Sequence, residues 1–318
     1  MRYAQASKGQ VSYGTESTAY EQADDTDEYF GIVTEAVEVP NPNEVTPMAT
    51  AGGRRGPHLN SPEARTYEFD VPFLVLDSNA PFEFALGDRE TTDEDGYTKH
   101  LFTEADRLPT MTVEHRQDDV DFAQWFVGAK SSLDLSAEQG DPLEASMSMI
   151  AAERDYDDDA DEAPNLSVPQ DRSPFRFWMA GDVTLADPDD GDTVEELATV
   201  TGFDLSWDNG LEAHHTGGGR DAYAVVETTA AEKYDMSITA TVTDTDLYAR
   251  AAEDDAPVDV EIPFHRPPGQ DDDALYVRLK ECTVTSAPIP MAEEGVVETE
   301  LELAPRDTEI EIREPNSA

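Results

Sequence analysis

The sequence predicts a mainly β protein built from two tandem β-sandwich or barrel domains, each with one short α-helix. Three observations carry this prediction. Apolar and polar residues alternate along several short segments, which is typical of strands with one buried and one solvated face. Polar loops rich in glycine and proline separate these segments. The order of segments in the first half of the chain recurs in the second half.

In the first half, strands are expected where this alternation occurs: Ile32–Val39, Tyr67–Leu76, Met111–His115, Trp125–Leu135 and Ser146–Ala152. Residues 40–65 hold five prolines and three glycines and form a long loop. Asp77 and Ser78 offer an N-cap for a short helix over Pro81–Leu86. Residues 87–103 are a polar insertion.

The second half follows an acidic stretch, residues 155–173, which we interpret as a solvated linker. A glycine-rich polar loop lies within residues 208–233, and Asp244 or Thr245 can cap a short helix over Asp246–Ala252. The strands expected in this half are Phe175–Leu185, Val200–Trp207, Tyr234–Thr243, Val258–Phe264, Leu275–Thr285 and Val296–Leu303.

The two halves match each other at nearly constant offsets. At an offset of 167, Tyr67 matches Tyr234 and the alternating faces of the two strands superpose. Further along the chain the offset is 150, and there His115-Arg116 matches His265-Arg266. The insertion at 87–103 accounts for the difference between the two offsets. We therefore expect a first β domain over residues 1–156, an acidic linker over 157–174 and a second β domain over 175–318.

Charge is the next constraint. The 318 residues contain 71 Asp and Glu against 21 Lys and Arg, a formal net charge of −50. The acidic residues are spread along the chain, so we interpret them as the solvated surface of a protein from a salt-rich cell, where 1 M salt screens charges beyond about 3 Å. A disordered acidic chain is the alternative, but 8% aromatic residues and clear alternation favour a packed core.

The composition also argues against several classes of protein. A protein that binds nucleic acid is expected to carry a basic patch with interleaved aromatic residues, and this sequence has no such patch. Cys282 is the only cysteine, so no disulfide can form within the chain. No run approaches the roughly 18 apolar residues of a membrane span, and the start lacks the apolar region of a signal peptide. We expect no membrane insertion and synthesis in the cytoplasm.

No pattern in the sequence points to catalysis or to a cofactor. His214-His215 could bind a metal, but no third ligand stands at a fixed spacing, so a polar loop is the simpler interpretation. The acidic runs DYDDDADE and DPDDGDTVEE lack the spacing of a calcium loop, which leaves weak association with monovalent or divalent cations. The loops TAGGRR and TGGGRD are not phosphate-binding loops, and Cys282 sits in an apolar strand. We expect no catalytic, cofactor-binding or metal site.

Several stretches resemble tail tube proteins of long-tailed, siphovirus-like phages and of haloarchaeal tailed viruses. They are YFGIVTEAVEVPNPN, GRRGP and NAPFEFALG in the first half, and VTGFDLSWDNGLEAHHTGGGRDAYAVV, KYDMSITATVTDTDLY and LAPRD in the second. The resemblance covers most of residues 10–313 as a pattern and an order of elements. It implies a β-sandwich or barrel with a short helix, and no enzymatic activity.

The resemblance also implies an assembly. Tail tube domains close into six-domain rings that stack into a tube for genome ejection, and a duplicated chain implies homotrimeric, pseudo-hexameric rings, with a homohexamer as the alternative. The implied location is the virion tail, and the implied partners are tape-measure, tail terminator and baseplate or tail-tip proteins, with viral DNA passing through the lumen. Loops 40–65 and 208–233 are expected to contact stacked rings, with these candidates: Asn43, Gly53, Arg54, Arg55, Asn209, His214, Gly219 and Arg220.

Three other functions remain open at this point. A tail terminator or baseplate hub protein would share the fold. A halophilic cell-surface adhesion module would share the composition, although it would need a secretion signal. An enzyme acting on carbohydrate would need a carboxylate pair or a metal triad, and neither stands out in the sequence.

Overall fold

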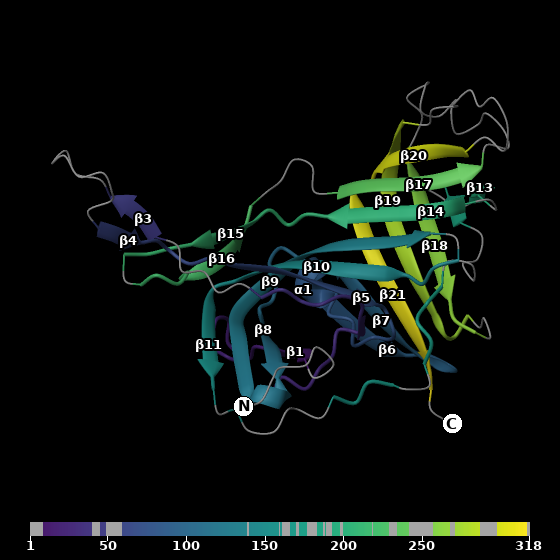
Figure 1. The fold of residues 1–318 in the computed structure, drawn as a ribbon. Coiled ribbons are helices and arrows are strands. Elements are labelled where there is room, and N and C mark those ends of the chain that lie inside the picture. The colour runs from purple at the N-terminus through teal and green to yellow at the C-terminus, as the bar shows by residue number, and fades with distance from the viewer. Residues whose placement is uncertain are drawn as a thin grey trace.

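The computed structural model describes residues 9–39, 45–48, 59–138, 140–158, 160, 166–169, 172–176, 183–186, 188, 193–197, 200–217, 219–228, 234–241, 257–267, 271–286 and 298–316. Within these ranges the fold is mainly β, as predicted, and the α-helix is α1 (Glu83–Leu86). Figure 1 shows the strands gathered into one body, from which a thin arm projects.

The strands of the first half are β1 (Gly9–Thr15), β2 (Ile32–Val33), β3 (Val45–Met48), β4 (Leu59–Pro62), β5 (Tyr67–Leu74), β6 (Gly87–Asp93), β7 (Tyr97–Glu104), β8 (Met111–Gln117), β9 (Phe122–Glu138), β10 (Glu144–Ala151) and β11 (Glu153–Asp157). Those of the second half are β12 (Val183–Ala186), β13 (Thr193–Leu197), β14 (Val200–Trp207), β15 (Leu211–His214), β16 (Ala224–Glu227), β17 (Tyr234–Thr241), β18 (Val258–His265), β19 (Ala274–Ser286), β20 (Glu298–Ala304) and β21 (Asp307–Pro315).

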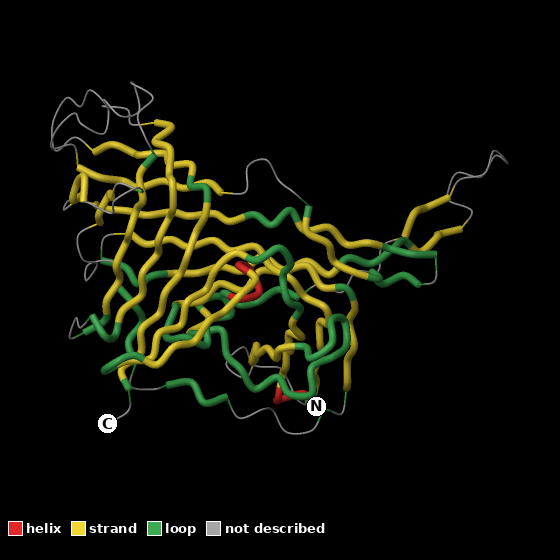
Figure 2. The backbone as a smooth tube through the Cα atoms, turned by 180° about the vertical axis from the view of Figure 1, so that it is seen from behind, coloured by secondary structure: helices red, strands yellow, loops and turns green. Residues whose placement is uncertain are grey.

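Two antiparallel sheets run through both halves of the chain. Sheet I has the order β2–β5–β10–β9–β14–β17–β20–β19. Sheet II has the order β6–β7–β21–β19–β18–β12–β13. A smaller sheet III has the order β1–β8–β9–β11. The strands of sheet II cross those of sheet I in Figures 1 and 2, and β9 and β19 each take part in two sheets.

Each half contains the same set of strand pairings. In the first half β8 pairs with β1 and β9, β9 also pairs with β11 and β10, and β5 joins β10 to β2. In the second half β18 pairs with β12 and β19, β19 also pairs with β21 and β20, and β17 joins β20 to β14.

The registers of these pairings repeat at the two offsets found in the sequence. His115 lies opposite Gln124, and 150 residues later His265 lies opposite Ala274. Val33 lies opposite Phe73, and 167 residues later Val200 lies opposite Ala240. The limits of the two predicted domains stay a prediction, because sheets I and II continue from one half into the other.

Some local predictions were wrong. The strand expected over Ile32–Val39 ends at Val33. The polar insertion at 87–103 is a hairpin, β6–β7. Strand β6 is polar and mostly exposed, and in β7 the buried residues are His100 and Phe102, so no run of alternating apolar residues marked the hairpin. Helix α1 starts at Glu83 and has no side-chain cap, so Asp77 and Ser78 do not cap it. The helix expected over 246–252 lies outside the described residues.

The core lies between the sheets and draws on both halves. In β5 the buried side chains are Tyr67, Phe69, Val71 and Phe73, while Glu68 and Asp70 point to solvent, as the alternation predicted. Rings from distant strands meet there: Phe69 and Phe126 have centroids 4.8 Å apart, and Phe203 and Phe264 5.9 Å apart. Cys282 is fully buried in the same cluster. The buried side chains of the two halves belong to one cluster.

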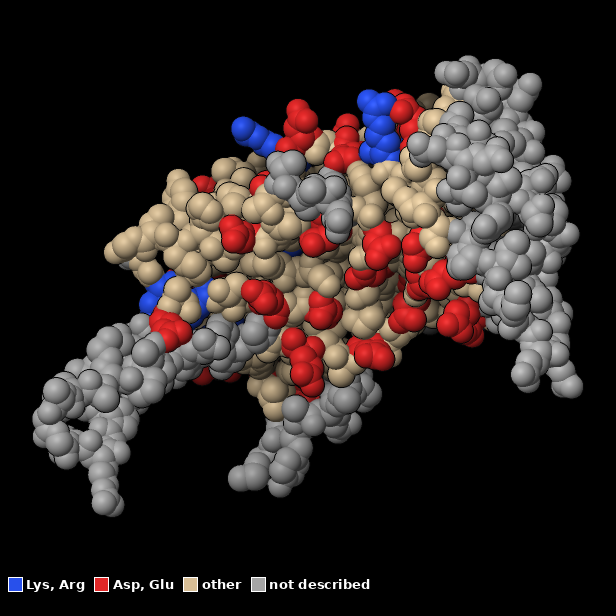
Figure 3. All heavy atoms as spheres, turned by 90° about the horizontal axis from the view of Figure 1, so that it is seen from above, with Lys and Arg blue, Asp and Glu red and all other residues tan. Residues whose placement is uncertain are grey.

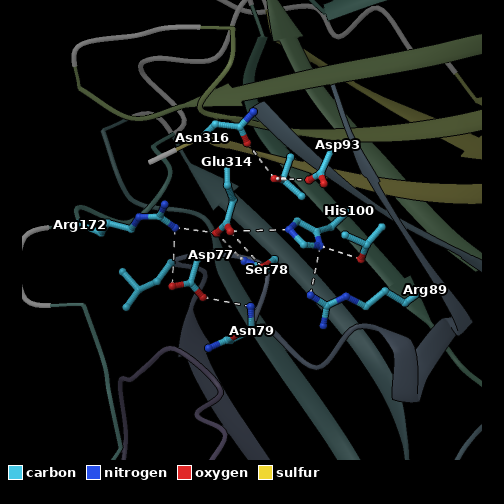
Figure 4. Close-up of polar contacts among 12 residues, drawn as sticks. Asp77, Ser78, Asn79, Arg89, Asp93, His100, Arg172, Glu314 and Asn316 are labelled. Carbon is cyan, nitrogen blue, oxygen red and sulfur yellow. Dashed lines mark hydrogen bonds and ion pairs between the residues drawn. The ribbon is translucent and has the colours of Figure 1, made fainter. Parts of the chain in front are cut away.

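A polar cluster fixes the end of the chain to the first half (Figure 4). The Glu314 carboxylate on β21 accepts hydrogen bonds from the Ser78 backbone N–H and hydroxyl, both at 3.2 Å, and from Arg172 Nη1 at 2.6 Å. His100 Nε2 lies 3.7 Å from the same carboxylate. Arg172 also lies 3.8 Å from Asp77, so one cation bridges a carboxylate from each half.

The surroundings of Glu314 make its charge stabilising. Burial alone would raise the pKa of this carboxyl, but the interactions with His100 and Arg172 outweigh it and lower the pKa from 4.5 to about 2. A carboxyl whose pKa is lower in the folded state than in the unfolded state stabilises the fold at any pH above the unfolded-state pKa. This stabilisation is lost as the pH falls through the folded-state pKa. The shift in pKa corresponds to about 3 kcal/mol of stabilisation of the folded state, which is present above pH 4.5 and is lost between about pH 4.5 and 2.

We expect Glu314→Gln to lower the free energy of unfolding at pH 7 by about 2–3 kcal/mol, because Arg172 loses the nearer of its two carboxylate partners and keeps Asp77 at 3.8 Å. The variant should also lose less stability than the parent chain between pH 4.5 and 2. Denaturant unfolding in molar KCl across this range measures both effects. Glu309→Gln, on the same strand but outside the cluster, is the matched control, and an acid response of Glu314→Gln equal to that of the parent chain would contradict the assignment.

Candidate functional site: internal joint, arm and acidic face

The two halves are joined edge to edge through β9 and β14, a pairing we call the internal joint. Its register places Leu133 opposite Trp207, Leu135 opposite Leu205 and Ala137 opposite Phe203. All six side chains are buried, and Trp207 is fully so. Backbone hydrogen bonds and apolar cross-strand pairs therefore act together to hold the edge of one half against the edge of the other.

A second seam reinforces the internal joint in sheet II. There the hairpin strand β7 pairs with β21 over its whole length, from Thr103 opposite Glu309 to Tyr97 opposite Pro315. The hairpin β6–β7 thus belongs to the first half but completes a sheet of the second half. No equivalent of this hairpin was expected in the second half, because residues 87–103 have no counterpart there.

Asn209 lies at the end of the internal joint, where β14 leaves the sheet. Its side chain is 4% exposed, and Nδ2 donates to the carbonyls of Ala85 at 2.8 Å and Ser131 at 2.7 Å. Its backbone N–H donates to the Ser132 hydroxyl at 3.0 Å. The donors of Asn209 are therefore used within the chain, and its buried side chain has none left for a contact between stacked rings.

The arm in Figures 1 and 2 brings together the two loops that the sequence singled out. It consists of the hairpins β3–β4, from loop 40–65, and β15–β16, from loop 208–233. The Arg65 N–H donates to the Arg220 carbonyl at 2.8 Å, and Arg220 Nε donates to the Glu63 carbonyl at 2.8 Å. Corresponding loops of the two halves thus form one projection.

The base of the arm is attached to the body by side chains that sequence reasoning missed. The Tyr67 hydroxyl donates to Asp221 at 2.6 Å, and Arg65 lies 3.7 Å from the same carboxylate. The Tyr20 hydroxyl donates to the Val225 carbonyl at 2.9 Å. These partners are more than 150 residues apart, and no periodic pattern in the sequence links them.

The remaining stacking candidates have different positions. His214 at the end of β15 and Gly219 are exposed, and Arg220 is half-buried against the other hairpin. His214 and Gly219 are therefore placed where a second molecule can reach them. Asn43, Gly53, Arg54 and Arg55 lie outside the described residues.

The outward face of sheet I carries carboxylates and hydroxyls in alternation. Across the strands, one row runs Glu144, Ser136, Asp204, Ser237 and Glu302, each directly opposite the next. The neighbouring row, two residues along, runs Ser146, Asp134, Ser206 and Asp235. In these two rows each carboxylate therefore lies opposite a serine. This arrangement keeps like charges from lying directly opposite each other, where they would destabilise the sheet.

Charge repulsion persists along the diagonals of this face. The pKa of Asp204 is raised, first by partial burial and then by the nearby charge of Glu300. Figure 3 shows Asp and Glu side chains spread over the side of the molecule that it views, with few Lys and Arg among them. The alternation of serine and carboxylate lets an acidic face remain a regular sheet.

Candidate catalytic and metal-binding groups do not converge in the part of the chain that the structure describes. Among these residues no three His, Cys, Asp or Glu side chains are placed to hold a metal ion. Arg266 is 2% exposed, donates a hydrogen bond to the Leu76 carbonyl, and lies over the Phe175 ring with Cζ 4.0 Å from the ring centroid. These contacts give Arg266 a structural role. No helix within the described ranges is long and apolar enough to cross a membrane.

Comparison with known proteins gives one match that covers nearly the whole chain. The model of a family described as phage tail tube protein matches residues 6–305. No curated protein matches the sequence. This family is structural and not enzymatic, and its members are components of the virion tail. With its duplicated β fold and a match over almost all of its length, the chain belongs to the phage tail tube protein family.

Proposed function

We propose that the chain is the major tail tube subunit of a tailed virus, and that three chains close into a pseudo-hexameric ring. The observation that carries this proposal is the internal joint. Two halves with the same strand pairings already stand side by side in one continuous sheet. A ring of three chains repeats that relation around an axis and contains six such halves. Six chains per ring is the alternative stoichiometry.

Open sheet edges support closure of a ring. Sheet I ends at β2 on one side and at the end of β19 on the other, and an exposed edge is prone to uncontrolled pairing. An interface between two different edges is heterologous, and such interfaces generate either closed rings or open filaments. The internal joint sets a fixed rotation between halves, and six uses of it close the ring if that rotation is about 60° with no rise along the axis.

The acidic and serine-rich face of sheet I is the surface we assign to the lumen. A lumen of carboxylates and hydroxyls repels phosphates and offers DNA no cation to bind, so the duplex can pass without being retained. The rings then stack into a conduit for ejection of the genome. The arm, which projects from the body, is the element we assign to contacts between stacked rings.

Other tail components complete the proposed assembly. Tape-measure, tail terminator and baseplate or tail-tip proteins would start, measure and end the tube. The net charge of −50 supports a haloarchaeal host and a siphovirus-like tail in a salt-rich cell. Weak association of cations with the acidic runs would follow from the same charge.

The stoichiometry can be tested by measuring the native mass of the smallest closed species in molar KCl, together with electron microscopy of the same sample. We expect rings of three chains. Rings of six chains would keep the tail tube assignment and overturn the pseudo-hexamer. A protein that stays monomeric in high salt, even with a tail-tip extract as initiator, would overturn ring formation.

The lumen assignment predicts the effect of reversing charge on sheet I. In tubes that carry Asp134→Lys, Asp204→Lys and Asp235→Lys, we expect short DNA duplexes to be retained and protected from a salt-tolerant nuclease, because lysines on this face bind phosphates. Parent tubes should retain none. Lysines at the exposed residues Glu90, Asp95 and Glu153 are the control. Protection by the control, but not by the sheet I variant, would show that another face lines the lumen.

A further inference from the structure

The hairpin β15–β16 of the arm belongs to the second half of the chain but rests on the first half. The Glu227 carboxylate accepts hydrogen bonds from Lys130 Nζ at 2.7 Å and from the Leu108 N–H at 3.0 Å. Just before β16, the Ala222 N–H donates to the Ala152 carbonyl at 2.9 Å. These contacts hold the two ends of β16, so the direction of the arm also depends on what holds the middle of the strand.

Tyr20, from the segment that follows β1, holds the middle of β16. Its hydroxyl donates to the Val225 carbonyl at 2.9 Å and accepts from the Val225 N–H at 3.2 Å. Val225 is fully buried and lies opposite Ala213 of β15, and its two backbone groups face Tyr20 on the open edge of the hairpin. A phenol hydroxyl can donate and accept at once, so Tyr20 takes the place of a neighbouring strand at this edge.

Tyr20 is held in a backbone conformation that is uncommon for an aromatic residue. Its φ is 66°, in the left-handed region, and such a conformation persists only where the surrounding contacts fix it. The buried Glu16 carboxylate supplies these contacts, since it accepts hydrogen bonds from the Tyr20 N–H at 2.8 Å and the Gly128 N–H at 2.7 Å. The Thr110 and Thr112 hydroxyls donate to the same carboxylate at 2.6 and 2.9 Å. Glu16 is therefore fixed itself and fixes Tyr20.

Gly128 leaves the space that the Tyr20 ring needs. It lies at the irregularity in the pairing of β8 with β9 and has a φ of 68°. A Cβ atom at Gly128 would lie 2.4 Å from Cδ1 of Tyr20, well inside the contact distance of two carbon atoms. Glu16 and Gly128 thus direct the ring toward β16, where its hydroxyl meets Val225.

This hold on the arm is not something that the shared fold of the two halves requires. The counterpart of β1 in the second half is β12, and residues 187–199, which follow β12, contain no tyrosine. Tyr67, which contacts the base of the arm, has Tyr234 as its counterpart, and the Tyr234 hydroxyl donates to Glu104 of β7 and not to an arm. The contacts that seat the arm are therefore specific to the half on which it rests.

We propose that Tyr20 is a positioning residue of the arm. Its hydroxyl, aimed by Glu16 and Gly128, fixes the direction in which the arm leaves the body, and thereby the way in which one ring meets the next. This inference rests on the proposed role of the arm in ring stacking and deepens it. Several arms of one ring can engage a neighbouring ring at the same time only if each arm is held in the matching direction.

The variant Tyr20→Phe removes the hydroxyl and keeps the ring. Spin labels at Thr216→Cys in the arm and Glu90→Cys on β6, both exposed positions, report the direction of the arm as a distance distribution from pulsed electron paramagnetic resonance. Labelled chains are diluted with unlabelled chains, and the native Cys282 can stay because it is fully buried. We expect a broader distribution than in the parent chain, because the Val225 backbone groups lose their partner.

Ring stacking is the second measurement. In molar KCl, we expect Tyr20→Phe to form rings as the parent chain does, but to need a protein concentration about tenfold higher for tubes, the factor that loss of about one hydrogen bond gives. Val225→Pro removes the N–H from the side of the arm and leaves the body unchanged, so it should have the same two effects. The matched control is Tyr13→Phe, whose hydroxyl donates to the Asn79 carbonyl at 2.7 Å within the body, and it should change neither result.

The two measurements separate this inference from the proposed function. If Tyr20→Phe leaves the distance distribution unchanged, or if Tyr13→Phe broadens it equally, Tyr20 does not position the arm. A broadened distribution with unchanged tube formation overturns the link between the direction of the arm and stacking. Parent rings that never stack overturn the proposed role of the arm, whereas the distance distribution still decides whether Tyr20 holds it.

Discussion

Antiparallel pairing of β9 with β14 is the interaction on which the rest of the structure depends. An unpaired edge in a sheet of this length would be a site of aggregation, and here the edge of each half is covered by the other. The same pairing aligns the apolar sides of both halves over one core, to which the opposed residues Trp207 and Leu133 both belong. Separating the halves would expose this core as well as the edges, so the chain folds as a joined pair.

The pairing also determines how so much negative charge can be carried by one surface. Sheet I can present carboxylates on a continuous face because its register sets Ser136 opposite Asp204 and Asp134 opposite Ser206 across the joint itself. A shift of one residue would turn the apolar side chains to solvent. A shift of two would also disturb the match of serine with carboxylate. Charge pattern and core packing thus require the same register.

The strand pattern of the first half could be predicted where one face is buried and the other is solvated. Tyr67 to Leu74 shows this alternation, and the offsets of 167 and 150 recur in the strand register. The sequence indicates a polar insertion where the β6–β7 hairpin lies, because β6 is polar and mostly exposed and the buried residues of β7 are His100 and Phe102. Ile32–Val39 was predicted as one strand from its alternation, and only the part beside β5 pairs within a single chain.

The contacts that position the candidate surfaces could not be predicted, since they join residues far apart in the sequence. Glu314 meets Ser78 across 236 residues, and Tyr67 meets Asp221 across 154. Neither pair belongs to a periodic pattern, and both depend on how the sheets cross. Asn209 was selected because it lies in a polar loop, but its burial follows from the place where β14 leaves the sheet.

The central claim is that one kind of joint is used within the chain and between chains. A reconstruction of the assembled tube by electron cryomicroscopy tests it most directly. The account predicts three chains per ring and approximate superposition of the first half on the second after a 60° rotation. A ring in which successive halves are not related by one common rotation would contradict it.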